Sequence, residues 1–278
     1  MFKPTKFAGL RLNRPIVMGI INVTPDSFSD GGKFFEPEKA IAHGIKLAKE
    51  GADILDVGGE STRPGALPTS LEDELVRVLP VIKGLAPVGV PISIDTRHPE
   101  VMEAAVSAGA QIVNDITALT GDEKSPELIR RLRVPVVLVH MQGEPRTMQQ
   151  QPSYTDVVTE VFGYFSERVT TLEKFGIPKS QIAIDPGIGF GKSLDHNLSI
   201  LGNLDKFLSI GCVLLLGVSR KSFINSIYSK SSTYSRIGGS IAAALTGIRR
   251  GVGILRVHDV ATTCEALSVW SAIEAVDC

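Results

Sequence analysis

Cysteine is scarce in this sequence, and its few copies form no recognisable pattern. Only three of the 278 residues are cysteines, Cys212, Cys264 and Cys278, and no two of them have the C-x-x-C spacing. An odd, scattered set argues against a disulfide framework and against a structural zinc site. It is typical of reduced thiols in a cytoplasmic protein.

Long apolar runs and an excess of one charge are absent too. The longest apolar runs, such as residues 212–218, are far shorter than the ~18 residues of a membrane span. Residues 1–15 carry charge but no apolar core, so we expect no signal peptide. The net charge is −1 and the pI is near 6.5, which argues against proteins that bind nucleic acids or anionic membranes. These absences favour small-molecule substrates as the partners of this chain.

What the sequence does contain is a regular alternation of short apolar runs with amphipathic segments. The runs are near-continuously apolar, as is typical of parallel strands buried on both faces. They predict strands at residues 15–21, 53–57, 91–95, 111–114, 135–140, 182–185, 213–218 and 254–258. Eight strands alternating with helices indicate an α/β protein, a (β/α)₈ TIM barrel whose single domain spans residues 1–278. A doubly wound open sheet is the alternative, but it does not require eight strands.

The amphipathic segments predict helices between the strands. Apolar residues recur three and four positions apart, which is the helical period. In the first helix they are Ile41, Ile45 and Ala48, and in the last they are Ala266, Val269, Trp270 and Ile273.

Polar residues follow every predicted strand. They are Asn22, Asp56, Asp95, Asn114 with Asp115, His140, Asp185, Ser219 with Arg220 and Lys221, and His258 after Arg256. Active sites of this fold form at the carboxyl ends of the strands. We therefore expect these side chains to share one mouth, although any one of them alone reads equally well as a solvated loop residue or a satisfied buried carboxylate.

The residue types in this mouth indicate two walls. Asp95, Asn114 and Asp185 suit a flat heterocycle with a guanidine-like hydrogen-bonding edge, because carboxylates accept charge-assisted bonds from paired N–H groups. Residues after the seventh and eighth strands, which include Lys221, Arg256 and His258, lie where phosphate sites of such barrels form. Asn22 neighbours this anion wall and could supply one oxygen to Mg²⁺.

Two loops are candidates for closing over a ligand. Residues 22–35 and 58–70 are rich in turn-forming residues, and the first also carries three phenylalanines. The glycine-rich run at 185–193 is not a Walker A loop, because Pro186 occupies the position of its first glycine. We expect no nucleotide site there.

Together these motifs resemble the dihydropteroate synthase family of pterin-binding barrels. The resemblance covers residues 15–262 and rests on NVTPDSFSDGG, DVGGESTRPG, SIDT, VNDI, VHMQGEPRTMQ, DPGIGFGK, GVSRKSFI and RVHDV. It implies that p-aminobenzoate is joined to 6-hydroxymethyl-7,8-dihydropterin diphosphate, a step of folate biosynthesis that gives 7,8-dihydropteroate and diphosphate. It also implies a homodimer formed through outer helices, and a p-aminobenzoate pocket that sulfonamides occupy.

The resemblance further implies a role for individual residues. The pterin would be held by Asp56, Asp95, Asn114, Met141, Asp185, Lys221 and Arg256. The diphosphate would be held by Asn22, Thr62, Arg63, Arg256 and His258, with Asn22 on the Mg²⁺. The p-aminobenzoate pocket would be formed by Phe28, Thr62, Arg63, Pro64, Phe190, Ser219 and Lys221. The catalytic residues would be Asp30, Arg63, Lys221, Arg256 and His258.

For the reaction we favour a dissociative, SN1-like path, in which Asp30 stabilises the cation or accepts the released proton.

Two other functions are open. One is a binding module for corrinoid-dependent methyl transfer, which would keep the heterocycle wall but would have no use for the remaining motifs. The other is a phosphosugar enzyme, which would share only the anion site.

Overall fold

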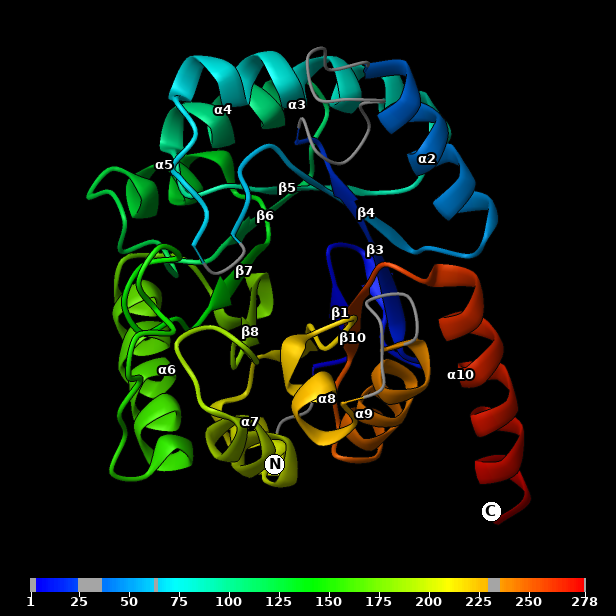
Figure 1. The fold of residues 1–278 in the computed structure, drawn as a ribbon. Helices are drawn as coiled ribbons and strands as arrows, with labels where there is room; N and C mark the ends of the chain where they lie inside the picture. The colour runs from blue at the N-terminus through cyan, green and yellow to red at the C-terminus, as the bar shows by residue number, and fades with distance from the viewer. Residues whose placement is uncertain (1–3, 25–36, 63–64, 230–235, 278) are drawn as a thin grey trace.

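The computed structural model describes residues 4–24, 37–62, 65–229 and 236–277, and its centre is a closed barrel of parallel strands (Figure 1). The barrel strands are β3 (Ile16–Asn22), β4 (Ile54–Gly58), β5 (Ile92–Asp95), β6 (Ile112–Asp115), β7 (Val136–Val139), β8 (Ile182–Asp185), β9 (Val213–Leu216) and β10 (Ile254–Val257). Residues of β10 pair with β3, with Ile254 opposite Ile16, and this pairing closes the barrel. The predicted strands and the (β/α)₈ architecture are confirmed, and the open sheet is excluded.

Helices surround the barrel on its outer side (Figure 1). They are α2 (Pro37–Lys49), α3 (Leu71–Leu85), α4 (Pro99–Ser107), α5 (Ser125–Leu132), α6 (Val157–Lys174), α7 (Leu194–Gly202), α8 (Ser222–Ile227), α9 (Ile237–Arg249) and α10 (Val260–Glu274). Short 3₁₀ helices are η1 (Ala86–Val88), η2 (Lys179–Gln181), η3 (Leu204–Ile210) and η5 (Ala275–Asp277). Side chains fix several helix starts: Ser70 caps α3, Asp156 caps α6, and Ser193 forms a capping box with His196 at α7.

Side chains alternate between the inside and the outside of the barrel along each strand. Inward residues form one apolar cluster, which comprises Phe7, Ile16, Met18, Ile54, Ile112, Val137, Val139, Ala183, Val213, Leu215 and Ile254. Their strand neighbours, for example Val17, Leu55, Val113 and Leu255, pack outward against the helices in a second cluster. The barrel interior is therefore a packed core rather than a channel.

A short hairpin contributes to the interior core. It consists of β1 (Lys6–Phe7) and β2 (Leu10–Arg11), which pair antiparallel. Phe7 is only 1% exposed and belongs to the interior cluster, and burying such a side chain is worth about 1.5–3 kcal/mol. Apolar residues therefore fill the barrel from this side, and the polar residues gather at the carboxyl ends of the strands.

The predicted first and last helices are present, and the residues they bury most deeply differ in part from the apolar repeats that predicted them. In α2 the fully buried residues are Ala40, Gly44 and Leu47, while the predicted Ile41, Ile45 and Ala48 lie half-buried beside them. In α10 the buried residues are Val260, Thr263 and Leu267, whereas Val269 and Ile273 are 58% and 60% exposed. Because α10 carries apolar residues on more than one face, periodicity alone does not show which face meets the barrel. In the part of the chain that the structure describes, no helix has the length and apolarity that a membrane crossing requires.

Candidate functional site

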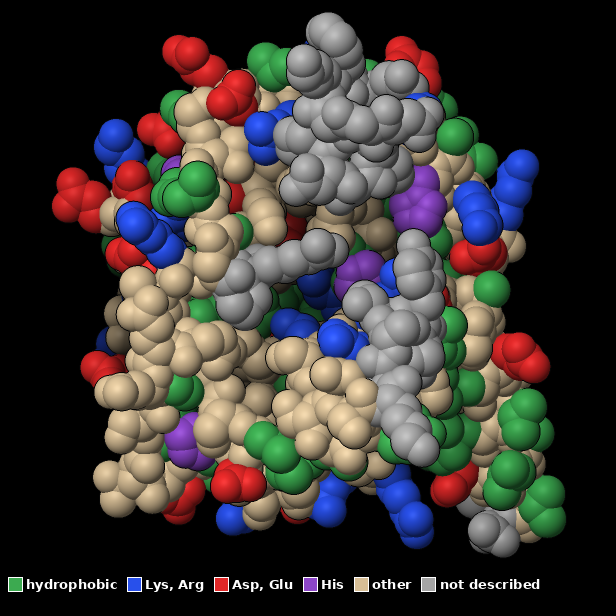
Figure 2. Space-filling view, in the orientation of Figure 1, with side chains coloured by type: hydrophobic (Ala, Val, Ile, Leu, Met, Phe, Trp, Pro, Cys, Tyr) green, Lys and Arg blue, Asp and Glu red, His purple; other side chains and the backbone are tan. Residues whose placement is uncertain are grey.

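The carboxyl ends of the strands open on a hollow in which basic side chains gather (Figure 2). At its floor, Arg256 of β10 connects two carboxylates from other strands. Its Nε donates to Asp56 Oδ2 and its Nη2 to Asp95 Oδ2, each at 2.6 Å. Each of these three residues lies two positions after an inward-facing residue of its own strand, namely Ile54, Ser93 and Ile254, and so has the same inward parity. Their side chains therefore meet inside the barrel although they are distant in sequence.

Two buried oxygens beside this ion pair have no partner among the described residues. They are Asp56 Oδ1 and Asn114 Oδ1. The amide of Asn114 is oriented by its Nδ2, which donates to Asp56 Oδ2 at 3.3 Å. An unsatisfied buried acceptor costs about 1–3 kcal/mol, so a ligand that offers N–H donors at this point gains affinity by satisfying both.

The charges at the floor respond differently to burial. Burial raises the pKa of Asp95 to about 7, and the positive charge of Arg256 offsets part of that rise. Burial works against the charged form of Arg256, but Asp56 and Asp95 outweigh it, and the pKa of the guanidinium is raised. Arg256 therefore stays a cation at neutral pH, while Asp95 is close to taking up a proton.

Asp185 lies at the end of β8 and faces the same hollow. Its Oδ1 accepts a hydrogen bond from the backbone N–H of Gly187 at 2.8 Å. Burial raises the pKa of Asp185, and the Gly187 bond and the charges of Lys221 and Arg256 work in the opposite direction. Asp95, Asn114 and Asp185 thus all face inward, from β5, β6 and β8, as the heterocycle wall requires.

A lysine and a phenylalanine stand together next to Asp185. Lys221 Nζ lies 4.1 Å from the centroid of the Phe190 ring, within the range of a cation–π contact. Burial lowers the pKa of Lys221 to about 8, and the negative charge of Asp185 offsets part of that fall. Gly189 has a positive φ of 81°, and a Cβ there would lie 3.3 Å from Lys221 Cδ, so the turn passes close to the lysine.

Ser219 and His258 form a pair on the anion wall. Ser219 Oγ accepts from the backbone N–H of His258 at 3.1 Å and lies 3.1 Å from its ring Nδ1. Burial, reinforced by the charge of Arg256, lowers the pKa of His258 to about 3. The imidazole is therefore neutral at pH 7 and meets an anion as a hydrogen-bonding group rather than as a cation.

Arg220 is paired with Asp259, the residue that follows His258. Its Nε donates to Asp259 Oδ2 at 3.0 Å and its guanidinium also bonds the other oxygen of that carboxylate. Its backbone has a φ of 58°, and its N–H donates to Ser240 Oγ at 2.9 Å. Because one residue of the turn is left-handed, Arg220 and Lys221 point to different surroundings.

Asp115 and His140 do not face the mouth, because they have the outward parity of their strands. Asp115 Oδ1 accepts from the backbone and hydroxyl of Thr117, both at 2.7 Å, and its Oδ2 accepts from Leu119 N–H. The His140 ring packs edge-on against Tyr164 of α6, 5.0 Å between centroids. Both residues were predicted as mouth residues, and for both the prediction is wrong.

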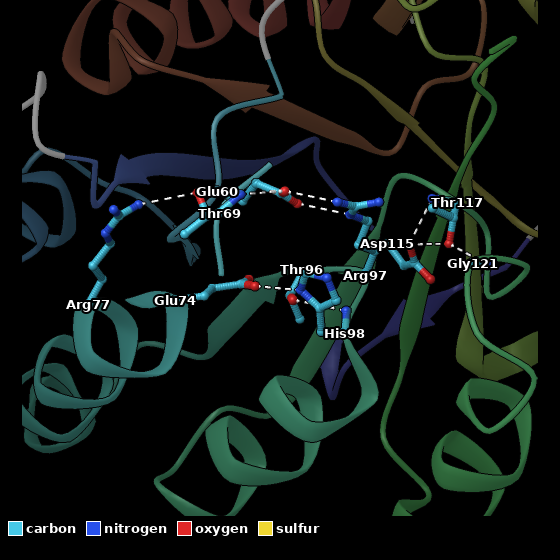
Figure 3. Close-up of polar contacts among 10 residues, drawn as sticks. All are labelled: Glu60, Thr69, Glu74, Arg77, Thr96, Arg97, His98, Asp115, Thr117 and Gly121. Atoms are coloured by element: carbon cyan, nitrogen blue, oxygen red, sulfur yellow. Dashed lines mark hydrogen bonds and ion pairs between the residues drawn. The ribbon is translucent and has the colours of Figure 1, made fainter. Parts of the chain in front are cut away.

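The loop after β4 is anchored at its base. Arg97, after β5, donates from Nε and Nη2 to the two carboxylate oxygens of Glu60, each at 3.0 Å (Figure 3). Arg77 of α3 donates to the carbonyl oxygen of Gly59 at 2.9 Å, and the Thr69 N–H donates to Glu60 Oε1 at 3.2 Å. A bidentate pair fixes orientation as well as charge, so the residues flanking the tip of this loop are held in place.

A second carboxylate braces the same region. His98 Nδ1 lies 2.7 Å from Oε2 of Glu74, a residue of α3 that is completely buried (Figure 3). The hydrogen bond to Glu74 raises the pKa of His98. Neither Glu60 nor Glu74 follows a strand directly, so the strand-end pattern did not predict them.

The remaining predicted residues fall into two groups. Asn22 and Met141 have the inward parity of Met18 and Val139 and are half-buried, and Thr62 is half-buried in the loop after β4. Phe28, Asp30, Arg63 and Pro64 lie outside the described residues.

The donor set for Mg²⁺ near Asn22 is small. Among the described residues no group of three or more His, Cys, Asp or Glu side chains is placed to hold a metal ion. A single amide oxygen fits Mg²⁺ only when phosphate oxygens and water supply the other ligands, which is a common arrangement for this ion.

A family model described as pterin binding enzyme matches residues 18–258. The dihydropteroate synthase of Neisseria meningitidis serogroup B strain MC58 is 48% identical over 268 residues, which cover 94% of each chain. The solved structure of Xanthomonas albilineans dihydropteroate synthase with 4-aminobenzoic acid has a TM-score of 0.90 and 49% identity, over 96% of this chain and 97% of that one. The same enzyme in complex with 7,8-dihydropteroate has a TM-score of 0.87 and 47% identity, over 96% of both chains. This chain therefore belongs to the family of pterin-binding enzymes.

Proposed function

We propose that this chain condenses 6-hydroxymethyl-7,8-dihydropterin diphosphate with p-aminobenzoate, as a dihydropteroate synthase does. The observation that carries the proposal is the pair of unsatisfied buried acceptors, Asp56 Oδ1 and Asn114 Oδ1, beside Asp95. A pterin edge offers the N–H donors that these oxygens lack. The names of the relatives and the ligands in their structures support the same reaction.

In this proposal the pterin lies across the floor of the mouth. The unsatisfied oxygens of Asp56 and Asn114 accept from its polar edge together with Asp95 and Asp185, and Arg256 completes the floor beneath them. Met141 supplies an apolar contact to the ring. A charge-assisted bond to a buried carboxylate is worth about 1.5–3 kcal/mol, so two such bonds suffice to fix the orientation of the ring.

The diphosphate lies towards β9, β10 and β3. Asn22, Thr62, Arg63, Arg256 and His258 are its proposed contacts, and Asn22 is the proposed protein ligand of Mg²⁺. A bound Mg²⁺ would neutralise part of the charge on the phosphate oxygens. His258, neutral before the anion binds, would donate a hydrogen bond, and the approaching negative charge favours its protonation.

The p-aminobenzoate is proposed to lie over Phe190 and Lys221. The ring face of Phe190 suits an aromatic amine, and the Lys221 ammonium beside it suits a carboxylate or a leaving diphosphate oxygen. The remaining members of the proposed pocket are Phe28, Thr62, Arg63, Pro64 and Ser219. The same pocket would admit sulfonamides, which have the shape of p-aminobenzoate.

The reaction breaks one C–O bond and forms one C–N bond. The electron pair of the C–O bond leaves with the diphosphate, and the dihydropterin stabilises the resulting cation by delocalisation. The amine nitrogen is neutral near pH 7, so its lone pair attacks the methylene carbon without a strong base, and it then loses a proton. Asp30 is the proposed group that stabilises the cation or accepts this proton.

We also propose that residues 1–278 form one functional domain, located in the cytoplasm as the scattered cysteines favour. A homodimer is proposed through outer helices, and the exposed Val269 and Ile273 of α10 support such a contact. Light scattering of the purified chain tests it.

The test of the reaction is direct. The purified protein is incubated with p-aminobenzoate, the pterin diphosphate and Mg²⁺, and dihydropteroate is measured. Omission of either substrate provides the control. A protein that binds pterin but forms no dihydropteroate would point to the methyl-transfer binding module, and one that prefers sugar phosphates to pterin would point to a phosphosugar enzyme.

A further inference from the structure

Among the described residues, Lys192 is a deeply buried cation that the proposed reaction leaves unused. Its side chain is only 2% exposed. Its Nζ lies 2.9 Å from His140 Nδ1, 3.3 Å from the His140 carbonyl oxygen and 3.0 Å from the Phe190 carbonyl oxygen. A lysine ammonium carries three N–H donors, and these three acceptors match them.

This lysine lies where two mouth loops press together. Gly187 and Gly191, with φ of 69° and 61°, are left-handed. A Cβ on Gly187 would overlap the carbonyl oxygen of His140, and one on Gly191 would overlap that of Gln142. The loop after β8 therefore lies with its backbone directly against the loop after β7, and Lys192 joins the two.

The turn after β8 contains two residues that the proposed reaction uses, Asp185 for the pterin and Phe190 for the p-aminobenzoate. Asp185 Oδ1 accepts from Gly187 N–H at 2.8 Å, and the Gly187 carbonyl accepts from Phe190 N–H at 3.0 Å. The Phe190 carbonyl in turn accepts from Lys192. Hydrogen bonds within the turn thus link Asp185 of the heterocycle wall to the backbone of Phe190, whose ring lies beneath Lys221, and to Lys192.

We propose that Lys192 is a positioning residue for the arylamine pocket, which holds the turn against His140 so that the Phe190 ring stays beneath Lys221. It touches neither substrate. The proposal rests on the proposed synthase reaction.

A role in stability alone explains Lys192 poorly. Burial lowers the pKa of this lysine to about 7, so its charge is held at a cost. An apolar side chain of similar length, such as methionine, would fill the same space without that cost. What methionine lacks is the three donors that fix the two carbonyl oxygens and the imidazole.

The test compares Lys192→Met with a matched control. Arg168 of α6 also ties down a loop, because its Nε and Nη2 donate to the carbonyl oxygens of Ala118 and Leu119 at 2.7 and 2.6 Å. That loop carries no proposed substrate contact. In steady-state assays we expect Lys192→Met to raise KM for p-aminobenzoate about tenfold or more, with a smaller effect on KM for the pterin diphosphate, since small misplacements of a binding group have large effects. Arg168→Met should leave both KM values within about twofold, because it removes only fold contacts.

Phe190→Leu supplies the second measurement. If Lys192 acts through Phe190, the effect of Lys192→Met on KM for p-aminobenzoate disappears in the Phe190→Leu background, because the two changes then act on one contact. Should Lys192→Met not fold, His140→Leu removes a single acceptor and is expected to change the same KM in the same direction.

The outcomes separate the two proposals. An active wild-type protein whose Lys192→Met variant resembles Arg168→Met, or whose changes at 192 and 190 are additive, would overturn the role of Lys192 alone. A wild-type protein that forms no dihydropteroate overturns the synthase reaction and, with it, this role.

Discussion

Replacing Arg256 by methionine removes the only cation that bonds two of the mouth carboxylates directly in the part of the chain described. Asp56 is completely buried and the Asp95 side chain is 11% exposed, and each loses a bond of 2.6 Å. Removing one partner of a buried ion pair costs about 3–5 kcal/mol, because the other charge is left uncompensated. We expect a loss of unfolding free energy of that size at pH 8.

The loss should be smaller at low pH. The pKa of Asp95 is about 7 in the folded protein, raised by burial from 3.8 and held down in part by Arg256. The native state therefore binds more protons than the unfolded state between these values, and this group makes stability fall as pH rises through that window. Without Arg256 the pKa of Asp95 rises further, and the fall continues above pH 7. At pH 5 Asp95 is protonated in both proteins, so the loss no longer includes an uncompensated charge on Asp95 and should be smaller than at pH 8.

Urea unfolding at pH 5 and pH 8 measures both effects. Arg131→Met is the control, since Arg131 pairs with Glu103 at 2.7 Å on the surface, with side chains 57% and 49% exposed. Such a pair contributes about 0–1 kcal/mol. The reasoning fails if Arg256→Met loses no more stability than Arg131→Met, or if its loss is the same at both pH values.

Three further outcomes are expected at other positions. Asp185→Asn should weaken binding of free pterin about tenfold or more while leaving diphosphate binding within about twofold; calorimetry with each ligand checks this, and equal pterin affinity would contradict it. His98→Gln should cost about 1–2 kcal/mol at pH 6, and the loss should shrink as pH rises through the raised pKa of His98, because the charged pair with Glu74 exists only below it; thermal unfolding across pH decides. Synthase activity should fall as pH rises through about 8, where Lys221 loses its charge above Phe190, and Lys221→Arg should shift that fall to higher pH in initial-rate profiles.

The barrel could be predicted from sequence because its strands are short, mostly apolar runs that are buried on both faces. All four residues of the run 213–216 are buried, on the inner and on the outer face of the barrel. Such a run can be recognised as a strand without knowing which strands or helices it packs against. The structure places each barrel strand within two residues of the prediction. Helix faces were harder to predict, since α10 has apolar residues on its outer side as well.

The site was predictable where the alternation of side chains was respected. Asn114 and Asp115 are adjacent in one strand, and only Asn114 shares the inward parity of Ile112. At the end of a strand only every second side chain points into the mouth. The prediction placed both Asn114 and Asp115 there and so was wrong for Asp115. His140 fails for the same reason, because it is one residue beyond the inward Val139.

Residues that act through loops could not be found in this way. Lys192 meets His140 across 52 positions of sequence, and Glu60 meets Arg97 across 37. Both contacts depend on the paths of loops that turn at left-handed glycines or run from a strand to the following helix. A glycine-rich stretch that ends in lysine suggested only a phosphate loop, and the absence of that motif left Lys192 without an explanation.

The mouth combines charges that are fixed with charges that can change. Arg256 keeps its charge because two carboxylates flank it, and this ion pair lies at the floor. Towards the proposed substrates stand groups that burial brings near neutrality, since the pKa of Asp95 is about 7 and that of Lys221 about 8. An incoming diphosphate favours the charged form of Lys221, and a pterin N–H edge favours the ionised form of Asp95. The ligands themselves therefore shift Lys221 and Asp95 to their charged forms. We expect these two groups to be fully charged only when the pterin diphosphate is bound, and not in the empty site.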